Sequence, residues 1–588
     1  MDVGGFFRGR AGLWRTAAIA WLVIGLFLLA RAQVWNGLHD LDTDDAMRLV
    51  QVRDWLAGQD WFDVDQHRGW PAPGFSIHWS RIPDLALGGL IALFGLVLPA
   101  PAAETAALVL WPLIQLFPAL AAVGFVARRL AGAPAMAPAM LLFGLLGPAL
   151  WQFPPGRIDH HALQLLGALV MLAGVMGLRR GAWMGVLAGL GGALSLAVGL
   201  EALVFWLVLC GAAGLILARD GARVRDAVLG LGLTVALATP LMAFAFNPTR
   251  YVASAVCDQV AWPVLALAVV GGLGLALAAG VGGRLASPLA RLALSAAAGV
   301  AGVAAFAWAG PACLQGPFAA VDPRLGPIWL DHVQEARTLP GLLGRFDPFG
   351  MASAVLLLIG LCAMTWVAWR RPARRWPLAI LGLLWLASIA MLFVQMRGIV
   401  YSVAFASPLI AAAMVGAARD AGVSRRDWGA VMLVGLILAV GLPLGGRALG
   451  KALAPKAQGA ALTSSKSCFD PGAYAGLGDL PPGLVAAPID SGPFILMASP
   501  HQVMSAPYHR NPEGIVAVHE MLKAPPAEAR VLARNLGVDY VVVCRSGEVL
   551  RLMRLAPAGL AARLEAGEVP DWLAPAAGEG EVRAWRVR

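Results

Sequence analysis

The sequence predicts a polytopic α-helical membrane protein, and three observations carry that prediction. Of the 588 residues, 59% are hydrophobic and only 14% are charged, whereas soluble domains carry about 25% charged residues. The mean hydropathy is +0.71. Apolar runs of about 20 residues, long enough to cross a bilayer as a helix, recur along most of the chain. These features exclude an ordinary soluble protein.

Thirteen apolar runs are long enough to be candidate spans. They lie near residues 14–32, 104–127, 133–151, 161–178, 182–198, 202–218, 226–246, 260–281, 288–309, 350–369, 377–396, 399–418 and 428–446. A shorter run, Leu85 to Leu98, gives a fourteen-span alternative if it also crosses. With thirteen spans the arginine clusters all face the cytoplasm, as the positive-inside rule requires. We therefore expect about 13 spans, with Leu85 to Leu98 lying along the outer leaflet or dipping into it.

This topology places the polar segments outside. Arg8, Arg10 and Arg15 precede the first run without a small-residue cleavage site after it, which is typical of a retained signal anchor with a cytoplasmic N-terminus. The longer external segments are 33–103, 152–160, 247–259, 310–349 and the tail, with tight turns at 199–201 and 397–398. The abundance of arginine, alanine, glycine and leucine suits a bacterium. We expect a multi-pass protein of the bacterial inner membrane, with its active site in the periplasm.

The net charge of +10 does not indicate nucleic acid as a partner. Most of the arginine sits in short loops between apolar runs, where positive charge orients helices and meets anionic membrane lipids. Membrane lipids, and no nucleic acid, are therefore the expected partners of this charge.

The chain is expected to divide into a transmembrane domain, 1–446, and a small periplasmic α/β domain, 447–588. In the tail, Leu484 to Ile489 and Val538 to Cys544 have the composition of buried strands, and Pro526 to Leu536 that of a helix. A turn is expected at residues 490–493 and a linker at 452–467.

Cysteine positions agree with an oxidising external compartment. Cys210 and Cys362 fall inside spans, where they are expected to pack as apolar residues. The other four lie in external segments, and we expect a Cys468–Cys544 disulfide. Cys257 and Cys313 form a second candidate pair, with free thiols as the alternative, because pairing cannot be deduced from sequence.

The first external segment concentrates acidic residues. Five aspartates lie within the stretch 38–56, and Ala46, Leu49, Val52 and Leu56 follow at helical spacing. This pattern predicts an amphipathic helix against the bilayer with Asp44 and Asp45 at its start. Carboxylates there suit metal binding or chemistry on a charged headgroup. The alternative is that they only cap the helix.

Three other external segments carry chemically capable residues. The loop before the fourth span contains Asp159, His160 and His161, the long late loop contains Glu335, and Arg397 stands at the outer end of a span. Carboxylates and imidazoles are ligands for divalent cations, and arginine is a bidentate donor to phosphate. The alternatives are interfacial histidines, a solvated Glu335 and an Arg397 that reaches to the interface. Glu201, between two apolar runs, is costly to bury and is a further candidate.

This set of residues and the topology resemble the GT-C glycosyltransferases, most closely the oligosaccharyltransferase catalytic subunits and more distantly the aminoarabinose and protein mannosyl transferases. Asp44 matches the catalytic Asp of the first external loop, with Asp45 beside it. Asp159 matches the first residue of the Asp-x-Asp motif, and His161 replaces the second. Glu335 matches the late-loop Glu, and Arg397 the Arg that holds the donor phosphates. Asp490-Ser491-Gly492 stands where the Trp-Trp-Asp-Tyr-Gly motif would be, without its aromatics.

The resemblance implies transfer of a sugar or oligosaccharide from a polyprenyl-phosphate or polyprenyl-diphosphate donor to a protein, lipid or glycan acceptor. Asp44 or Asp45 would be catalytic, and Mg²⁺ or Mn²⁺ would be the cofactor. Its expected ligands are Asp44, Asp159, His161 and Glu335, with Arg397 on the donor phosphate. Expected acceptor or sugar contacts are Asp490, Tyr508, His509 and Arg510. The alternatives are a polysaccharide polymerase or ligase, and a lipid-linked sugar flippase or transporter.

Overall fold

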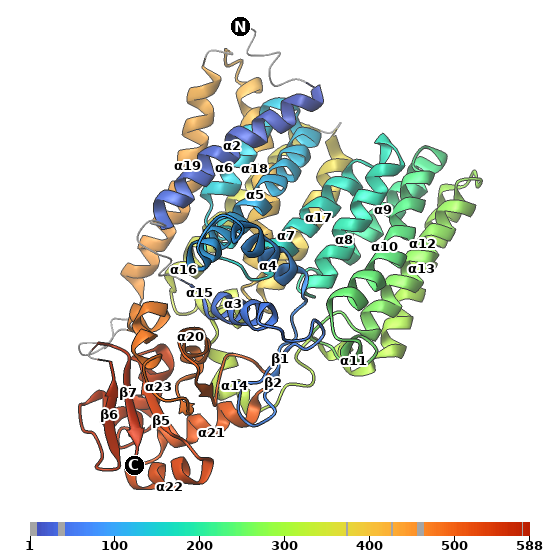
Figure 1. The fold of residues 1–588 in the computed structure, drawn as a ribbon. Helices are drawn as coiled ribbons and strands as arrows, with labels where there is room; N and C mark the ends of the chain where they lie inside the picture. Colours follow the sequence, from blue (N-terminus) through green and yellow to red (C-terminus); the bar gives the residue numbers. More distant parts are fainter. Residues whose placement is uncertain (1–8, 33–40, 372–373, 425–426, 455–463, 579) are drawn as a thin grey trace.

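The predicted fold class is confirmed. The computed structural model describes residues 9–32, 41–371, 374–424, 427–454, 464–578 and 580–588. A bundle of long helices forms the larger part, and a small domain containing a sheet, drawn in orange and red, lies at one end of the bundle (Figure 1). The segment with α3 and α4 lies between the two parts.

Within the described residues, ten helices are long and apolar enough to cross a membrane. They are α2 (Gly9–Ala32), α5 (Ala100–Ala131), α9 (Leu203–Asp220), α10 (Arg225–Phe246), α12 (Trp262–Gly282), α13 (Pro288–Ala309), α16 (Pro348–Arg370), α17 (Arg375–Leu392), α18 (Gly398–Asp420) and α19 (Trp428–Leu453). The other three expected spans contain the shorter apolar helices α6 (Met136–Leu145), α7 (His161–Met176) and α8 (Ala182–Val198). The last helix, α19, extends beyond the expected domain boundary at residue 446.

Helix α4 (Ile82–Phe94) corresponds to the doubtful fourteenth span. Its 13 residues rise about 20 Å, which is less than the roughly 30 Å of a hydrocarbon core. It packs against α5 and against α3 (Thr43–Leu56). The length favours a helix that does not cross; the number of spans and their orientation stay predictions.

The expected position of α3 against the bilayer is wrong. Leu49 and Val52 join the apolar core of the helical bundle, whereas Met47 and Val50 join a core that belongs to the C-terminal domain. Leu56, expected on the apolar face, is 47% exposed. The helix is buried on nearly all sides from Asp45 to Val52, polar side chains included, because two protein surfaces enclose it in place of one lipid surface.

The C-terminal domain is built on a five-stranded sheet in the order β4-β3-β5-β7-β6. Strands β4 (Gln502–Val503), β3 (Leu484–Ala486) and β5 (Tyr540–Val543) are parallel, and β7 (Arg583–Val587) and β6 (Leu573–Ala577) complete it antiparallel. Its helices are α20 (Gly492–Ala498), α21 (Pro512–Lys523), α22 (Pro526–Leu536), α23 (Gly547–Leu555) and α24 (Leu560–Glu565). The predicted α/β character, the two strands and the helix at 526–536 are therefore present.

The tail was also expected to contain a turn and a linker. The turn expected at residues 490–493 is wrong: a 3-10 turn, Ile489–Ser491, leads into α20, where Gly492 and Pro493 occupy the first turn. Proline suits that position because the amide there has no partner within the helix. The linker expected at 452–467 lies largely outside the described residues.

Short connecting elements carry the external loops. They comprise the hairpin β1 (Asp65–Gln66) and β2 (Phe75–Ser76), and the short helices α11 (Thr249–Val252), α14 (Leu325–Ile328) and α15 (Leu339–Leu343). Helix α14 packs against α21 of the C-terminal domain. The long late loop therefore contacts both parts of the molecule.

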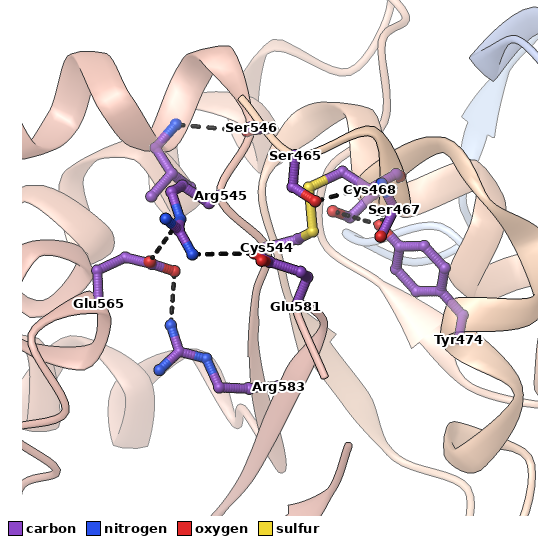
Figure 2. The surroundings of a disulfide bond; sticks show 12 residues. Ser465, Ser467, Cys468, Tyr474, Cys544, Arg545, Ser546, Glu565, Glu581 and Arg583 are labelled. Atoms are coloured by element: carbon purple, nitrogen blue, oxygen red, sulfur yellow. Dashed lines mark hydrogen bonds and ion pairs between the residues drawn. A yellow bond between two sulfur atoms is a disulfide. The ribbon is translucent and has the colours of Figure 1, made fainter. Parts of the chain in front are cut away.

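Both candidate disulfides are formed, Cys257 with Cys313 and Cys468 with Cys544. Figure 2 shows the second, which ties the start of the C-terminal domain to the end of β5. The Tyr474 hydroxyl donates to the Cys468 carbonyl oxygen at 2.9 Å, and Arg545 lies between the carboxylates of Glu565 and Glu581.

We expect Cys468→Ser to destabilise the C-terminal domain. The bond closes a loop with a sequence separation of 76 residues, for which chain-entropy estimates give about 4 kcal/mol. Faster proteolysis of the domain in the variant would show this, with Cys362→Ser, a change at a free thiol, as the matched control. Equal protease resistance in both variants would refute the stabilising role.

Candidate active site

A cavity of about 1420 Å³ lies between the helical bundle and the C-terminal domain. Each expected external segment contributes to its lining: the first loop, the 152–160 loop, the two tight turns, the 247–259 and 310–349 loops and the tail. We call it the central cavity. Because segments far apart in sequence meet there, the predicted site residues that line it can act together.

Asp45 holds two of these segments together. One carboxylate oxygen accepts the amide protons of Ile158 and Asp159, at 2.8 and 3.0 Å. The other accepts from the Asp42 amide at 3.2 Å, completing a capping box with Asp42, and from Arg157 at 3.1 Å. Asp45 is 1% exposed and does not line the central cavity. It therefore has the capping role that the sequence offered as an alternative.

Asp44, one residue away, points into the central cavity. Among the described residues no group donates a hydrogen bond to its carboxylate. Burial raises its pKa to about 8, and the carboxylates of Asp42 and Asp159 add to the effect. An uncompensated carboxylate in a cavity is costly, so this residue is poised for a cation or a proton.

Asp44, Asp159 and His161 each offer one ligand atom, and these atoms lie within 4.8 Å of one another. Asp159 is 1% exposed. Its Oδ2 lies 2.8 Å from an Arg157 nitrogen but without the geometry of a hydrogen bond, so this oxygen still has lone pairs to offer. Two carboxylates and an imidazole fit a divalent cation, and the three residues are the expected ligands apart from Glu335.

Glu335 lies instead in an ion-pair chain beside that cluster. Arg397 Nε donates to Glu335 at 2.8 Å, and an Arg397 Nη donates to Glu201. Glu201 in turn contacts His161 Nδ1 at 3.1 Å. Arg397 and both glutamates line the central cavity. These ion pairs therefore connect His161 of the cation cluster to Arg397, whose guanidinium is suited to binding phosphate.

Three of the four expected tail contacts line the cavity, and two of them, Asp490 and Tyr508, are free to face a substrate. Tyr508 is 2% exposed, lies between Phe75 and Trp79, and its hydroxyl has no partner among the described residues. Asp490 also lines the cavity, and burial raises its pKa to about 6, with the Asp42 carboxylate adding to the effect. Both can face a substrate.

The remaining two, His509 and Arg510, fasten the C-terminal domain to the bundle. Arg510 donates to both carboxylate oxygens of Asp258, at 2.7 and 2.9 Å, and His509 Nε2 lies 2.8 Å from the same carboxylate. His509 also lines the cavity, whereas Arg510 does not. Asp258 follows Cys257, whose disulfide to Cys313 fixes the loop.

Asp258→Asn should loosen this attachment. Although burial opposes ionisation, hydrogen bonds from His509 and Arg510 hold the Asp258 pKa well below its usual range. The stabilisation is therefore present above pH 4 and is lost as the pH falls. Loss of the charge leaves Arg510 poorly paired, at a cost of about 2 kcal/mol, and hydrogen exchange in residues 501–511 should speed up at neutral pH. Asp322→Asn, which removes a pair with nearby Arg324, is the control; equal exchange in both variants would contradict the prediction.

No family model and no curated protein matches the sequence, but solved structures do. The oligosaccharyltransferase AglB from Archaeoglobus fulgidus, in complex with an inhibitory peptide and a dolichol-phosphate, aligns with a TM-score of 0.65 at 16% identity, over 95% of this chain and 72% of that chain. The chain has the GT-C fold of the oligosaccharyltransferases. A second structure of the Archaeoglobus enzyme, with Zn and sulfate, aligns with a TM-score of 0.54 at 16% identity, over 92% and 70% of the two chains. The fold that the sequence resemblance implied is thus confirmed.

Sequence reasoning missed two residues of the cavity region. Arg157 contacts Asp42, Asp45 and Asp159, and so sets the charge balance around Asp44. His78 lies in the cavity beside His509. The only signal for Arg157 was its place two residues before Asp159; His78 stood in a long loop without a motif.

Proposed function

We propose that this chain is an integral-membrane glycosyltransferase. It transfers a sugar or oligosaccharide from a polyprenyl-phosphate or polyprenyl-diphosphate donor to an acceptor at the outer face of the membrane. The observation that carries the proposal is the Asp44 carboxylate, which has no hydrogen-bond donor in the part of the chain that the structure describes. It faces the central cavity within 4.8 Å of ligand atoms of Asp159 and His161. The fold adds support, since dolichol-phosphate is present in the AglB structure.

In the proposed reaction, the acceptor nucleophile bonds to the anomeric carbon while the bond from that carbon to the leaving phosphate oxygen breaks. Asp44 takes the proton of the acceptor or orients it. Asp44, Asp159 and His161 would hold Mg²⁺ or Mn²⁺. A bound divalent ion supplies charge that stabilises the leaving phosphate and lowers the pKa of neighbouring carboxyls.

Arg397 is proposed to bind the donor phosphate as a bidentate donor. Glu201 and Glu335 hold its guanidinium at the cavity wall, so its orientation exists before substrate arrives. The proposed role of Glu335 is accordingly to position Arg397. To bind the cation as well, Glu335 would have to give up its ion pair with Arg397.

On the acceptor side, Asp490 and Tyr508 are proposed to contact the acceptor or the sugar. The acceptor is a protein, lipid or glycan, and the absence of aromatic residues around Asp490 in the sequence favours a group other than the sequon that the Trp-Trp-Asp-Tyr-Gly motif reads. The two disulfides support a periplasmic position for these loops, and the inner membrane of a bacterium is the proposed location.

The alternatives fare less well. A transporter is expected to place ionisable residues near the middle of the bilayer between broken helices, whereas here they gather at the interface with the C-terminal domain. A polymerase or ligase shares the donor chemistry and differs only in the acceptor.

The proposal is tested by mass spectrometry of glycolipids, glycans and periplasmic proteins from a strain lacking this gene, complemented with the wild type or with Asp44→Asn. We expect one glycosylated species to disappear in the deletion strain, to return with the wild type and not with the variant. Return of the species with Asp44→Asn would overturn the assignment of Asp44. Unchanged glycosylation in the deletion strain would count against the proposed reaction.

A further inference from the structure

A second, small pocket lies at the opposite end of the bundle from the central cavity. Helix α5 begins near α3, where Glu104 pairs with Arg53, and it ends at the pocket with Arg129. Helix α9 likewise begins at the cavity with Leu203 and ends at the pocket with Asp220. The C-terminal end of α7 and the N-terminal end of α17 complete the walls, so the pocket lies at the end of the bundle away from the central cavity.

The pocket has an excess of positive charge. Its polar lining consists of Arg129, Arg179, Arg219, Asp220 and the indole of Trp376. Arg179 makes two hydrogen bonds to Asp220, at 2.6 and 2.8 Å, and Arg219 Nε lies 3.8 Å from the same carboxylate. One aspartate therefore faces three arginines, which leaves a net charge of about +2.

The unmet hydrogen-bonding capacity is located at Arg129. Its Nε is buried and has no hydrogen-bond partner in the part of the chain that the structure describes. Attraction to helix C-termini explains why arginines gather here, but it does not satisfy a buried N–H, which costs about 1–3 kcal/mol when left unpaired. An anion in the pocket would balance the excess positive charge beside this poorly satisfied guanidinium.

The size and remaining lining of the pocket restrict the anion. The volume of about 50 Å³ is several times the roughly 15 Å³ that one water needs, which suits a phosphate group. Val175, Ile216 and Ile380 form an apolar wall, and Arg219 lies 4.5 Å from the ring centre of Trp376, a residue type enriched at membrane interfaces. We propose that this pocket binds the phosphate of an anionic phospholipid, independently of the reaction in the central cavity.

The test is native mass spectrometry of the purified full chain, delipidated and then mixed with phosphatidylglycerol or with phosphatidylcholine of the same acyl chains. We expect retention of phosphatidylglycerol over phosphatidylcholine, and about a tenfold loss of bound phosphatidylglycerol in Arg129→Gln and in Arg219→Gln. Arg284→Gln, which removes an exposed arginine near the end of α12 on the same face, is the matched control and should bind as the wild type does.

Several outcomes would overturn the proposal. Equal retention of both lipids would show that binding does not depend on the charge of the headgroup. Wild-type binding in both Arg129→Gln and Arg219→Gln would show that the lipid does not bind in this pocket. Displacement of phosphatidylglycerol by millimolar inorganic phosphate would identify a soluble anion as the ligand, whereas failure to displace it supports the lipid. Should Arg129→Gln fold poorly by size-exclusion chromatography, Arg219→Gln and the charge-conserving Arg129→Lys, expected to retain most of the lipid, decide the question.

Discussion

Asp44→Asn is expected to abolish transfer while leaving the protein folded and inserted in the membrane. The change is nearly isosteric, and no hydrogen bond among the described residues is lost, because the Asp44 carboxylate accepts none. It removes both a proton acceptor and a negatively charged cation ligand. General-base catalysis alone is worth about 10²- to 10⁴-fold, so turnover of purified enzyme with a lipid-linked donor should fall by at least about 100-fold.

Asp45→Asn is the matched control, and it should fail differently. Asp45 accepts hydrogen bonds from the amides of Ile158 and Asp159 and from Arg157, so the variant should lose thermal stability, with the loop that carries Asp159 loosened. If Asp44→Asn retains turnover and Asp45→Asn is stable but inactive, the two aspartates have exchanged their assigned roles.

Removal of divalent cations has the second largest expected effect. If Asp44, Asp159 and His161 share one ion, an excess of chelator should suppress turnover to near background, and added Mn²⁺ or Mg²⁺ should restore it. Binding of the ion should also reduce the repulsion among Asp42, Asp44 and Asp159 that helps raise the Asp44 pKa. Thermal stability at neutral pH should therefore rise when the ion is added, a readout independent of activity.

His161→Asp sharpens this test, because an all-oxygen ligand set favours the harder ion. The ratio of activity with Mg²⁺ to activity with Mn²⁺ should increase in the variant. His332→Asn, at a residue that lines the same cavity but belongs to none of the candidate metal groups among the described residues, should leave the ratio unchanged. Full turnover of the wild type in excess chelator would instead show that the reaction needs no divalent ion.

Local sequence patterns predicted most of the secondary structure. The helices lie where the apolar runs lie, because a backbone within lipid must satisfy its hydrogen bonds inside one segment, and about 20 apolar residues are needed to do so. The strand Tyr540–Val543, which lies within the predicted strand 538–544, and the helix Pro526–Leu536 were equally visible, because each has a strong hydrophobic pattern of its own. The turn expected at 490–493 failed because proline and glycine also begin helices.

The sequence by itself determined the membrane class and the candidate spans, and its resemblance to a known family predicted Asp44, Asp159, His161 and Arg397 as site residues. Only the tertiary structure separated Asp44 from Asp45, since two adjacent aspartates on a helix differ in what their side chains face. Only the tertiary structure showed that Glu335 forms an ion pair with Arg397 and that Arg510 forms one with Asp258. Hydrophobicity acts along a short stretch of chain, whereas these ion pairs join residues that are 62 and 252 positions apart. Composition and periodicity therefore reveal the apolar segments, whereas the long-range ion pairs are seen only in the folded chain.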